Sequence, residues 1–495
     1  MKKYLKRTFV AVASTILVLT TTSCNHYLDV AISTGQSEEY IFEDYTRALR
    51  YLDQLYYGML PTWAGNGKFS GHGMMESATD MSEYSASYGV TNQSFNVGDW
   101  TNSSAANEIE IWSTCYKNIR KAWKMLDHVN DFSNEPFGRK ETMKGECHFM
   151  LAYNYFELYR RYGGVPLVKN VLGLETDNQI PRATEDEVLE YILSELDLAQ
   201  TLLPEEWNKS QYGRADWCWI KALRSRVLLY AASPLHNPDK DVEKWKAAAD
   251  AAKDCIQYCD STGRHTLYPD YQRIFYGEYP DKVNEIIMFA RNSSSSVSFT
   301  SSLINYEQAT PGEGFEGQAS NGPSQNLVDR YPVIVYDGEG NAIGCEDFDW
   351  NNPDHVKNMY KNRDPRFYYT ILYNDAHWIK RNIETWFDGS GYGKDRDPKN
   401  EVFTKTGYYL RKYWPVACQW KNVPGSQILY GFYIRLAEIY LNYAEAMNEA
   451  YGPDEANGYL TALEAANKLR ERLVLPPTDS IPNKTSDPHY YVRVE

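Results

Sequence analysis

The pattern that most restricts the fold of this chain is a series of paired helical segments with small residues on their faces. Residues Asp216 to Ser233 place apolar side chains three and four positions apart, and the alanine-rich segment from Trp245 to Tyr258 does the same. This spacing is typical of one face of an α-helix. Small side chains on facing helices let the axes approach closely, as in stacked antiparallel pairs. The two segments therefore predict a helical-repeat frame.

Further segments with the same spacing extend this frame toward both ends of the chain. Helices are expected at residues 41–60, 105–130, 141–162, Tyr433 to Asn448 and Leu460 to Arg472. Residues Thr184 to Glu187 form a capping box, which predicts the start of another helix. A turn at Gly452 and Pro453 separates the last two segments. The tyrosine and alanine placement around Tyr443 resembles the degenerate tetratricopeptide pattern.

Residues 260–430 have a different character. Short β-like runs such as Glu285 to Phe289 alternate with stretches rich in Ser, Gly and Asn. Long irregular stretches inside a compact domain are commonly functional. These loops carry many aromatic residues of a chain that has 41 Tyr and 13 Trp. Aromatic rings pack on the C–H faces of sugars while nearby amides and carboxylates bond the hydroxyls, so this region favours a glycan site.

The first 24 residues are typical of a bacterial lipoprotein signal. A basic start at Lys2 to Arg7 precedes an apolar run from Phe9 to Leu19, and small residues lead to Cys24. The run is too short to span a bilayer of roughly 30 Å hydrocarbon thickness. We expect residues 1–23 to be removed as a signal peptide and Cys24 to be acylated, which would anchor the protein to a membrane surface.

The charge and the cysteines argue against a nucleic-acid-binding protein and against a disulfide-stabilised fold. Residues 1–23 hold four of the 51 basic residues and none of the 66 acidic ones, so their removal moves the net charge from -15 to about -19. This balance argues against nucleic acid as a partner. The eight scattered cysteines form no disulfide framework, and Cys255 and Cys259 are interpreted as buried residues of a helix. We expect no cofactor and no metal, calcium included.

Five stretches, in order along the chain, resemble one known family. They are Cys24 to Asp29, Phe149 to Val168, Gly213 to Ala215 with Arg226 to Pro234, Pro323 to Tyr331 with Asp364 to Phe367, and Arg435 to Glu449. On these residues the chain is similar to the SusD/RagB outer-membrane lipoproteins. The resemblance covers nearly the whole chain.

The resemblance implies a mainly α fold. It would have a tetratricopeptide-like frame of about four helix pairs and an irregular capping portion with short β-strands that holds the ligand site. The implied organisation is a signal peptide at 1–23, an N-terminal helical portion at 24–260, an aromatic-rich capping portion at 261–430, and a last helical repeat at 431–495. Because such proteins usually continue beyond this point, the C-terminus is expected to be truncated.

The resemblance also implies a function without catalysis. Members of this family bind oligosaccharides at the exterior face of the outer membrane and deliver them to a SusC-type TonB-dependent transporter. Ligand contacts come from the segment after the first helix, here 76–102, and from loops of the capping portion. The expected ligand-binding residues are Trp100, Asn102, Asp80, Tyr84, Tyr306, Asn305, Trp386 and Tyr392.

The sequence alone leaves three other functions open. Some members of the resembled family bind peptides, so the ligand is either an oligosaccharide or a peptide. A surface glycoside hydrolase would need paired carboxylates, but in so acidic a chain pairs such as Asp80 with Glu83 arise by chance. The third possibility is a scaffold whose helical repeats bind another protein and no small ligand.

Overall fold

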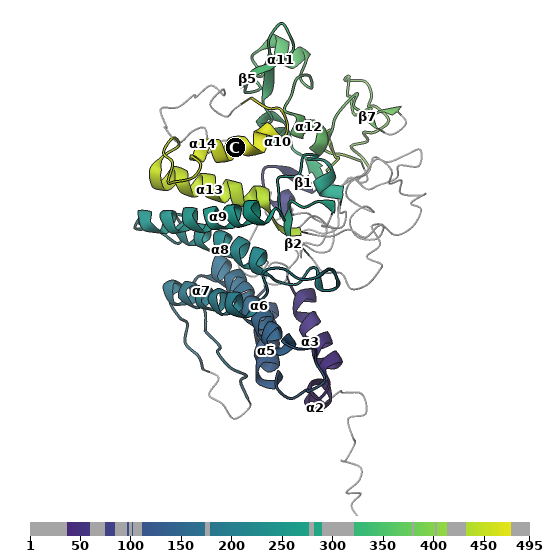
Figure 1. Ribbon diagram of the computed structural model, residues 1–495. Coiled ribbons are helices and arrows are strands. Elements are labelled where there is room, and N and C mark those ends of the chain that lie inside the picture. The colour runs from purple at the N-terminus through teal and green to yellow at the C-terminus, as the bar shows by residue number, and fades with distance from the viewer. Residues whose placement is uncertain are drawn as a thin grey trace, which may run out of the picture.

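A stack of α-helices makes up the larger part of the computed structural model (Figure 1). The structure describes residues 37–59, 75–84, 97–98, 101, 111–173, 179–276, 282–289, 321–378, 381–400, 403–412 and 432–476. The expected signal peptide and Cys24 therefore lie outside the described residues. None of the described helices combines the length and apolar content that a membrane span needs.

The helical frame consists of eight long helices, counted among the described residues. They are α3 (Tyr45–Tyr57), α5 (Trp112–His128), α6 (Arg139–Tyr162), α7 (Glu185–Leu202), α8 (Trp217–Ala232), α9 (Val242–Thr262), α13 (Leu436–Tyr451) and α14 (Ala462–Glu471). Short helix α2 (Glu38–Phe42) precedes them. Helix α6 packs on α7, α8 packs on α9, and α13 packs on α14. Because α13 also packs on α9, the last pair continues a stack that the chain left at the end of α9.

The ends of these helices follow the sequence signals. The predicted capping box is formed, since the Glu187 amide bonds Thr184 Oγ1 at 3.2 Å and the Thr184 amide bonds Glu187 Oε2 at 2.8 Å. Helix α9 is longer than predicted at both ends. It begins after Asp241, whose side chain caps it, and ends at Gly263, which has a left-handed φ of 66°. Both ends of α9 are therefore set by local sequence, a side-chain cap at its start and a left-handed glycine at its end.

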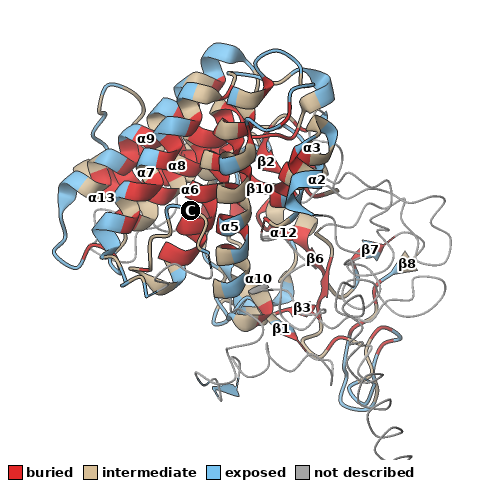
Figure 2. Ribbon diagram, turned by 90° about the horizontal axis from the view of Figure 1, so that it is seen from below, coloured by how far each residue is buried: buried red, intermediate tan, exposed pale blue. Residues whose placement is uncertain are grey.

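Helix α6 is the centre of the core. Every residue from Phe149 to Tyr159 is buried, whereas neighbouring helices have one exposed face (Figure 2). A helix that is apolar on all sides belongs in the interior of a protein. The predicted pair Cys255 and Cys259 on α9 is also fully buried, which confirms that these cysteines are core residues.

One short strand pair returns the chain to the frame. Strand β2 (Ile286–Phe289) pairs antiparallel with β10 (Phe432–Arg435), which leads directly into α13. The predicted helix from Tyr433 was wrong at its start because Tyr433 to Arg435 belong to this strand. The expected β-run at Glu285 to Phe289 is confirmed as β2.

The remaining elements are short and lie on one side of the frame, around the labels β1, α10, α11, α12 and β7 in Figure 1. The strands are β1 (Ser82–Tyr84), β3 (Asn321–Pro323), β4 (Val333–Tyr336), β5 (Ala342–Glu346), β6 (Ile371–Leu372), β7 (His377–Trp378), β8 (Arg381–Asn382) and β9 (Tyr409–Leu410). The helices are α10 (Gln325–Arg330), α11 (Pro353–Lys357) and α12 (Pro365–Thr370), with the 3₁₀ turn η1 (Met75–Ala78). Two further 3₁₀ turns are η3 (Lys209–Gln211), between α7 and α8 of the frame, and η4 (Arg273–Tyr276), which follows α9. All sheets formed by the described strands are two-stranded.

A buried ionic cluster ties three helices of the frame together. The carboxylate of Glu146, which is fully buried, accepts bonds from Arg214 at 2.7 Å, Arg139 at 2.5 Å and the Tyr56 hydroxyl at 2.7 Å. Burial raises the pKa of Glu146, but the two arginines outweigh it and hold the pKa below the usual value. Arg214 also bonds Asp53 at 2.5 Å, so α3, α6 and the start of α8 meet at one charged centre.

Replacing Arg214 tests the contribution of this cluster. Arg214→Gln leaves the buried carboxylate with one arginine, so the free energy of unfolding should fall by about 3 kcal/mol in urea denaturation. Arg224→Gln is the matched control, because Arg224 on α8 pairs with Asp197, whose side chain is 70% exposed. The control should lose less than about 1 kcal/mol. Equal losses of unfolding free energy in the two variants would show that the buried cluster contributes no more to stability than an exposed ion pair.

Candidate ligand-binding site

The segment after the first long helix meets the capping loops through a strand pair. Strand β1 lies antiparallel to β3, with Ser82 opposite Pro323 and Tyr84 opposite Asn321. Segments more than 200 residues apart in the sequence are thereby joined. This pairing brings part of the predicted segment 76–102 against the capping portion.

Serine and asparagine side chains fix this junction. The hydroxyl of Ser77 donates to Asn321 Oδ1 at 2.7 Å, and both residues are buried. The Ser82 hydroxyl donates to the Gly322 carbonyl at 3.2 Å. On the other strand, the Ser324 amide donates to the Met81 carbonyl at 3.0 Å. Buried polar groups with satisfied hydrogen bonds specify one geometry, so the junction has a defined shape.

A cavity of about 300 Å³ opens beside this junction. It is lined by Glu76, Met81, Ser82, Asn321, Pro323, Leu327, Tyr331, Thr370, Leu410 and Lys412. We call it the junction cavity. Apolar side chains, hydroxyls, an amide and two opposite charges share its wall, which is the mixture that small-molecule sites use for packing and orientation.

Tyr331 is held firmly in the wall of the junction cavity. Its ring meets Phe367 edge to face, with centroids 5.8 Å apart. Burial raises the pKa of Tyr331 to about 12, against a smaller lowering by its hydrogen bond to Thr370. The hydroxyl is therefore protonated and uncharged at neutral pH, and its ring supplies an aromatic surface that is already positioned.

A hairpin of the capping portion presents a second group of rings. We define the aromatic hairpin as residues 386–393, in which Trp386, Phe387 and Tyr392 are 42%, 54% and 45% exposed. The rings of Phe387 and Tyr392 stack, with centroids 4.8 Å apart and planes 23° apart. Three exposed rings on one short turn are the kind of surface that stacks on sugar faces.

The turn of the aromatic hairpin is built by Asp388 and two glycines. Asp388 Oδ1 accepts bonds from the amides of Ser390 and Gly391, each at 2.9 Å. Gly389 has a left-handed φ of 90°. At Gly393 a Cβ atom would lie 2.2 Å from the Glu384 carbonyl oxygen, so only glycine fits there. These contacts fix the positions of the exposed rings.

Half of the ligand residues expected from the sequence can be placed. Trp386 and Tyr392 lie together on the aromatic hairpin, and Asp80 is exposed beside the junction, where its carbonyl accepts the Ser324 hydroxyl. Tyr84 is completely buried, so its ring belongs to the interior of the junction. The other four, Trp100, Asn102, Asn305 and Tyr306, lie outside the described residues.

Sequence reasoning missed most of the cavity wall. Tyr331, Thr370 and Leu410 come from separate short elements, and no spacing in the chain links them. Phe387 was missed although it adjoins Trp386, and the nearby Gly389, Gly391 and Gly393 are a sequence signal for a turn that could have indicated it. Within the described residues, no group of three His, Cys, Asp or Glu side chains is suited to a metal ion.

Two family models match the chain one after the other. The first, described as starch-binding and associating with the outer membrane, matches residues 26–229. The second, the SusD family model, matches residues 284–493. Together they take in most of the chain. The chain belongs to the SusD/RagB family.

Known SusD-like proteins are similar in sequence and fold. A SusD-like protein of Formosa agariphila, P25, is 23% identical over 388 residues, which is 75% of this chain and 63% of that protein. The chain therefore spans less than two thirds of that relative. The crystal structure of a SusD-like carbohydrate-binding protein of Bacteroides fragilis has a TM-score of 0.68 at 23% identity, covering 92% of this chain and 83% of that one.

A laminarin-binding SusD-like protein is also similar in fold. Its TM-score is 0.55 at 21% identity, and the match covers 88% of this chain and 85% of that protein. The mainly α fold expected for a SusD/RagB protein is thus confirmed. Members of the family are associated with the outer membrane.

Two glycines of the aromatic hairpin give a matched test of its structure. In Gly393→Ala the new methyl group would clash with the Glu384 carbonyl, whereas a Cβ at Gly391 meets nothing within 4 Å. Gly393→Ala should therefore raise the hydrogen exchange of a peptide spanning residues 384–396 by about tenfold, and Gly391→Ala should leave it unchanged. The reporting amides are Gly393, bonded to Trp386, and Asp395, bonded to Glu384. The same exchange in both variants would contradict the close packing at Gly393.

Proposed function

We propose that this SusD/RagB protein binds an oligosaccharide at the bacterial surface and delivers it to a SusC-type TonB-dependent transporter. The observation that carries the proposal is the junction cavity, where β1 and β3 join two distant segments of the chain beside Tyr331. Its volume of about 300 Å³ is at the lower end of small-molecule sites. We infer that it holds one part of a longer glycan.

The lining of the junction cavity fits the chemistry of a sugar. Tyr331, Met81 and Leu410 supply apolar surface for C–H faces, while Asn321, Thr370 and Ser82 supply amide and hydroxyl groups. A glycan extends beyond one such cavity, and the aromatic hairpin offers exposed rings for a further unit. The binding of laminarin by one similar protein supports a β-glucan as a first ligand to test.

The proposed location is the outer membrane, facing the exterior. Removal of residues 1–23 and acylation of Cys24 would supply the anchor, and the association of the family with the outer membrane supports this assignment. We further propose that the capping portion, residues 261–430, supplies most ligand contacts and that the helical frame carries it. Delivery to the transporter would follow from capture at this surface.

We propose binding without catalysis. The similar proteins are described as carbohydrate-binding, which supports a capture role. Asp80 and Glu83 are the exposed carboxylates closest in sequence to the junction, and Glu76 lines the cavity. A peptide in place of the glycan is the second candidate within the family, and the same polar and apolar wall would suit it.

Affinity electrophoresis in gels that contain polysaccharides tests this function. The protein should be retarded by at least one neutral polysaccharide from a panel that includes laminarin, and no reducing ends should appear on long incubation. Release of reducing ends would contradict a binding protein. Failure against all glycans, with retention of a peptide ligand, would contradict the oligosaccharide assignment.

Replacing single aromatic residues with alanine tests which rings contact the ligand. Trp100→Ala should abolish retardation without lowering the melting temperature, because we propose Trp100 as a ligand contact. Trp386→Ala on the exposed hairpin should weaken retardation, since stacking on a ring contributes about 1 kcal/mol. Phe137→Ala is the control, because Phe137 is a fully exposed ring before α6 in the helical frame. A large loss of stability in Trp100→Ala, or equal weakening by Phe137→Ala, would contradict these roles.

A further inference from the structure

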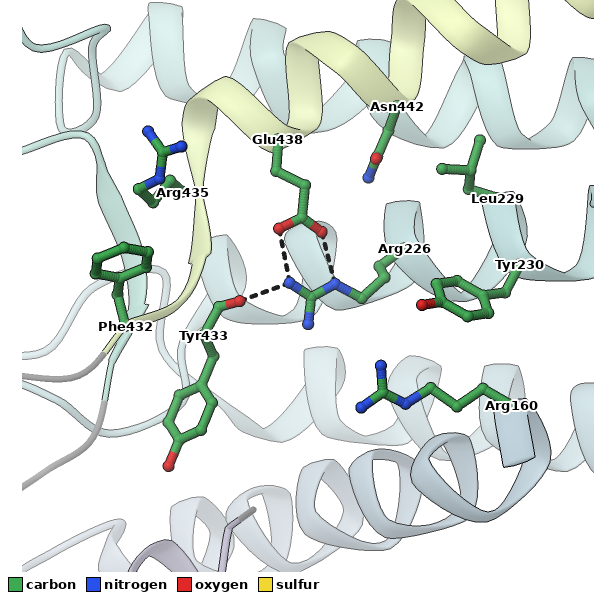
Figure 3. Close-up of a pocket in the computed structure, with 9 residues that line it drawn as sticks. All are labelled: Arg160, Arg226, Leu229, Tyr230, Phe432, Tyr433, Arg435, Glu438 and Asn442. Carbon is green, nitrogen blue, oxygen red and sulfur yellow. Dashed lines mark hydrogen bonds and ion pairs between the residues drawn. The ribbon is translucent and has the colours of Figure 1, made fainter. Parts of the chain in front are cut away.

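A second cavity, of about 360 Å³, lies within the helical frame and is separate in its lining from the junction cavity. Helices α6, α8 and α13 and strand β10 supply its wall (Figure 3). Its wall includes three arginines and further polar and aromatic residues, namely Arg160, Arg226, Arg435, Tyr230, Tyr433 and Asn442. We call it the arginine cavity. No part of the proposed glycan site uses it.

Arg226 is fixed by the protein but keeps one donor group unused. Its Nε and Nη2 atoms bond the two carboxylate oxygens of Glu438 at 2.6 and 2.7 Å, and Nη2 also bonds the Tyr433 carbonyl at 2.5 Å. Its third nitrogen, Nη1, has no hydrogen-bond partner among the described residues. Figure 3 shows this nitrogen directed toward the side of the cavity where Arg160 lies.

Arg160 faces the same space and is also incompletely bonded. Its Nη2 donates to Glu157 Oε2 at 2.7 Å, while its Nη1 has no hydrogen-bond partner within the described part of the chain. Glu157 does not depend on Arg160 alone, because Arg161 donates to the same oxygen at 2.6 Å. Two guanidinium groups with free donors thus share one cavity.

Positive charge exceeds negative charge around the arginine cavity. Glu438 balances Arg226, but fully buried Glu157 is shared by Arg160 and Arg161. Buried Glu285 is likewise shared by Arg435, at 2.5 Å, and by Arg472, at 2.6 Å. The whole chain is acidic, with a net charge of -15, so this local cationic excess is unusual for it. Two like charges that face one another in a poorly solvated space favour the binding of an anion.

The other groups on the wall select the kind of anion. Tyr230 and Tyr433 supply rings that pack on a sugar face. Asn442 donates its amide nitrogen to Ser225 at 3.2 Å, and its carbonyl oxygen has no partner among the described residues and can accept a sugar hydroxyl. Guanidinium groups pair with carboxylates in a planar geometry. A carboxylated sugar carries a complementary partner for each of these groups.

We propose that the arginine cavity is a second binding site, specific for a hexuronate, whose carboxylate lies between Arg160 and Arg226 and whose ring packs beside Tyr230 and Tyr433. The site would add acidic sugars to the ligands of the protein. It rests on the proposed function only for the general class of ligand, because its residues and cavity are distinct from those of the junction.

Calorimetric titration with glucuronate tests this second site. The full chain should bind glucuronate saturably. Glucose, which has the sugar ring without the carboxylate, and acetate, which has a carboxylate without the ring, should each bind at least about tenfold more weakly. Arg160→Gln should weaken glucuronate binding by about tenfold or more, and Arg160→Lys should restore part of it because it keeps the charge. Arg161→Gln is the matched control, since it also leaves Glu157 with one arginine but does not line the cavity.

The outcomes separate this site from the proposed glycan site. Unchanged affinity in Arg161→Gln, with similar melting temperatures for the two Gln variants, would support the role of Arg160. Absence of saturable glucuronate binding, equal affinity for inorganic sulfate, or equal weakening in both variants would overturn the proposal. Retardation by neutral polysaccharides reports on the proposed glycan site and not on the arginine cavity. Intact retardation without glucuronate binding therefore overturns only the hexuronate site.

Discussion

Buried glutamates shared by pairs of arginines are the interactions on which the rest of the structure depends. Glu146 binds Arg139 and Arg214, Glu157 binds Arg160 and Arg161, and Glu285 binds Arg435 and Arg472. All three carboxylates are fully buried. A buried carboxylate without its partners costs several kcal/mol. Glu146 and Glu285 therefore restrict how different elements pack together, whereas Glu157 and both of its arginines lie on α6.

Glu285 has the widest influence of the three. It lies directly before β2, its carboxylate binds arginines at the start of α13 and the end of α14, and its carbonyl accepts the Leu436 amide. The chain leaves the frame after α9 and returns at β10, so this one residue anchors both the departure and the return. The capping elements are held between these points, and β1 and β3 meet among them (Figure 1).

The sequence was sufficient for the frame because local chemistry decides where its helices begin and end. The Thr184 capping box formed where the pattern indicated, and α6 ends at Tyr162, the last residue of the expected range 141–162. The prediction failed at Tyr433, where pairing with β2 overrides helical spacing, and such pairing is not encoded locally. At the ligand site, Trp386 and Tyr392 were expected as ligand contacts, and the structure places both of them exposed on one turn. Tyr331 and Thr370 were beyond prediction, because only tertiary contacts bring them to Ser82.

We propose that a helical frame held by buried charges carries a glycan site at the junction of β1 and β3. A crystal structure with an oligosaccharide cut from a retained polysaccharide tests it most directly. We predict sugar density in the junction cavity, in contact with Tyr331 and Ser82 and continuing toward the aromatic hairpin. An oligosaccharide bound only on the helical frame, with the junction cavity empty, would contradict the account.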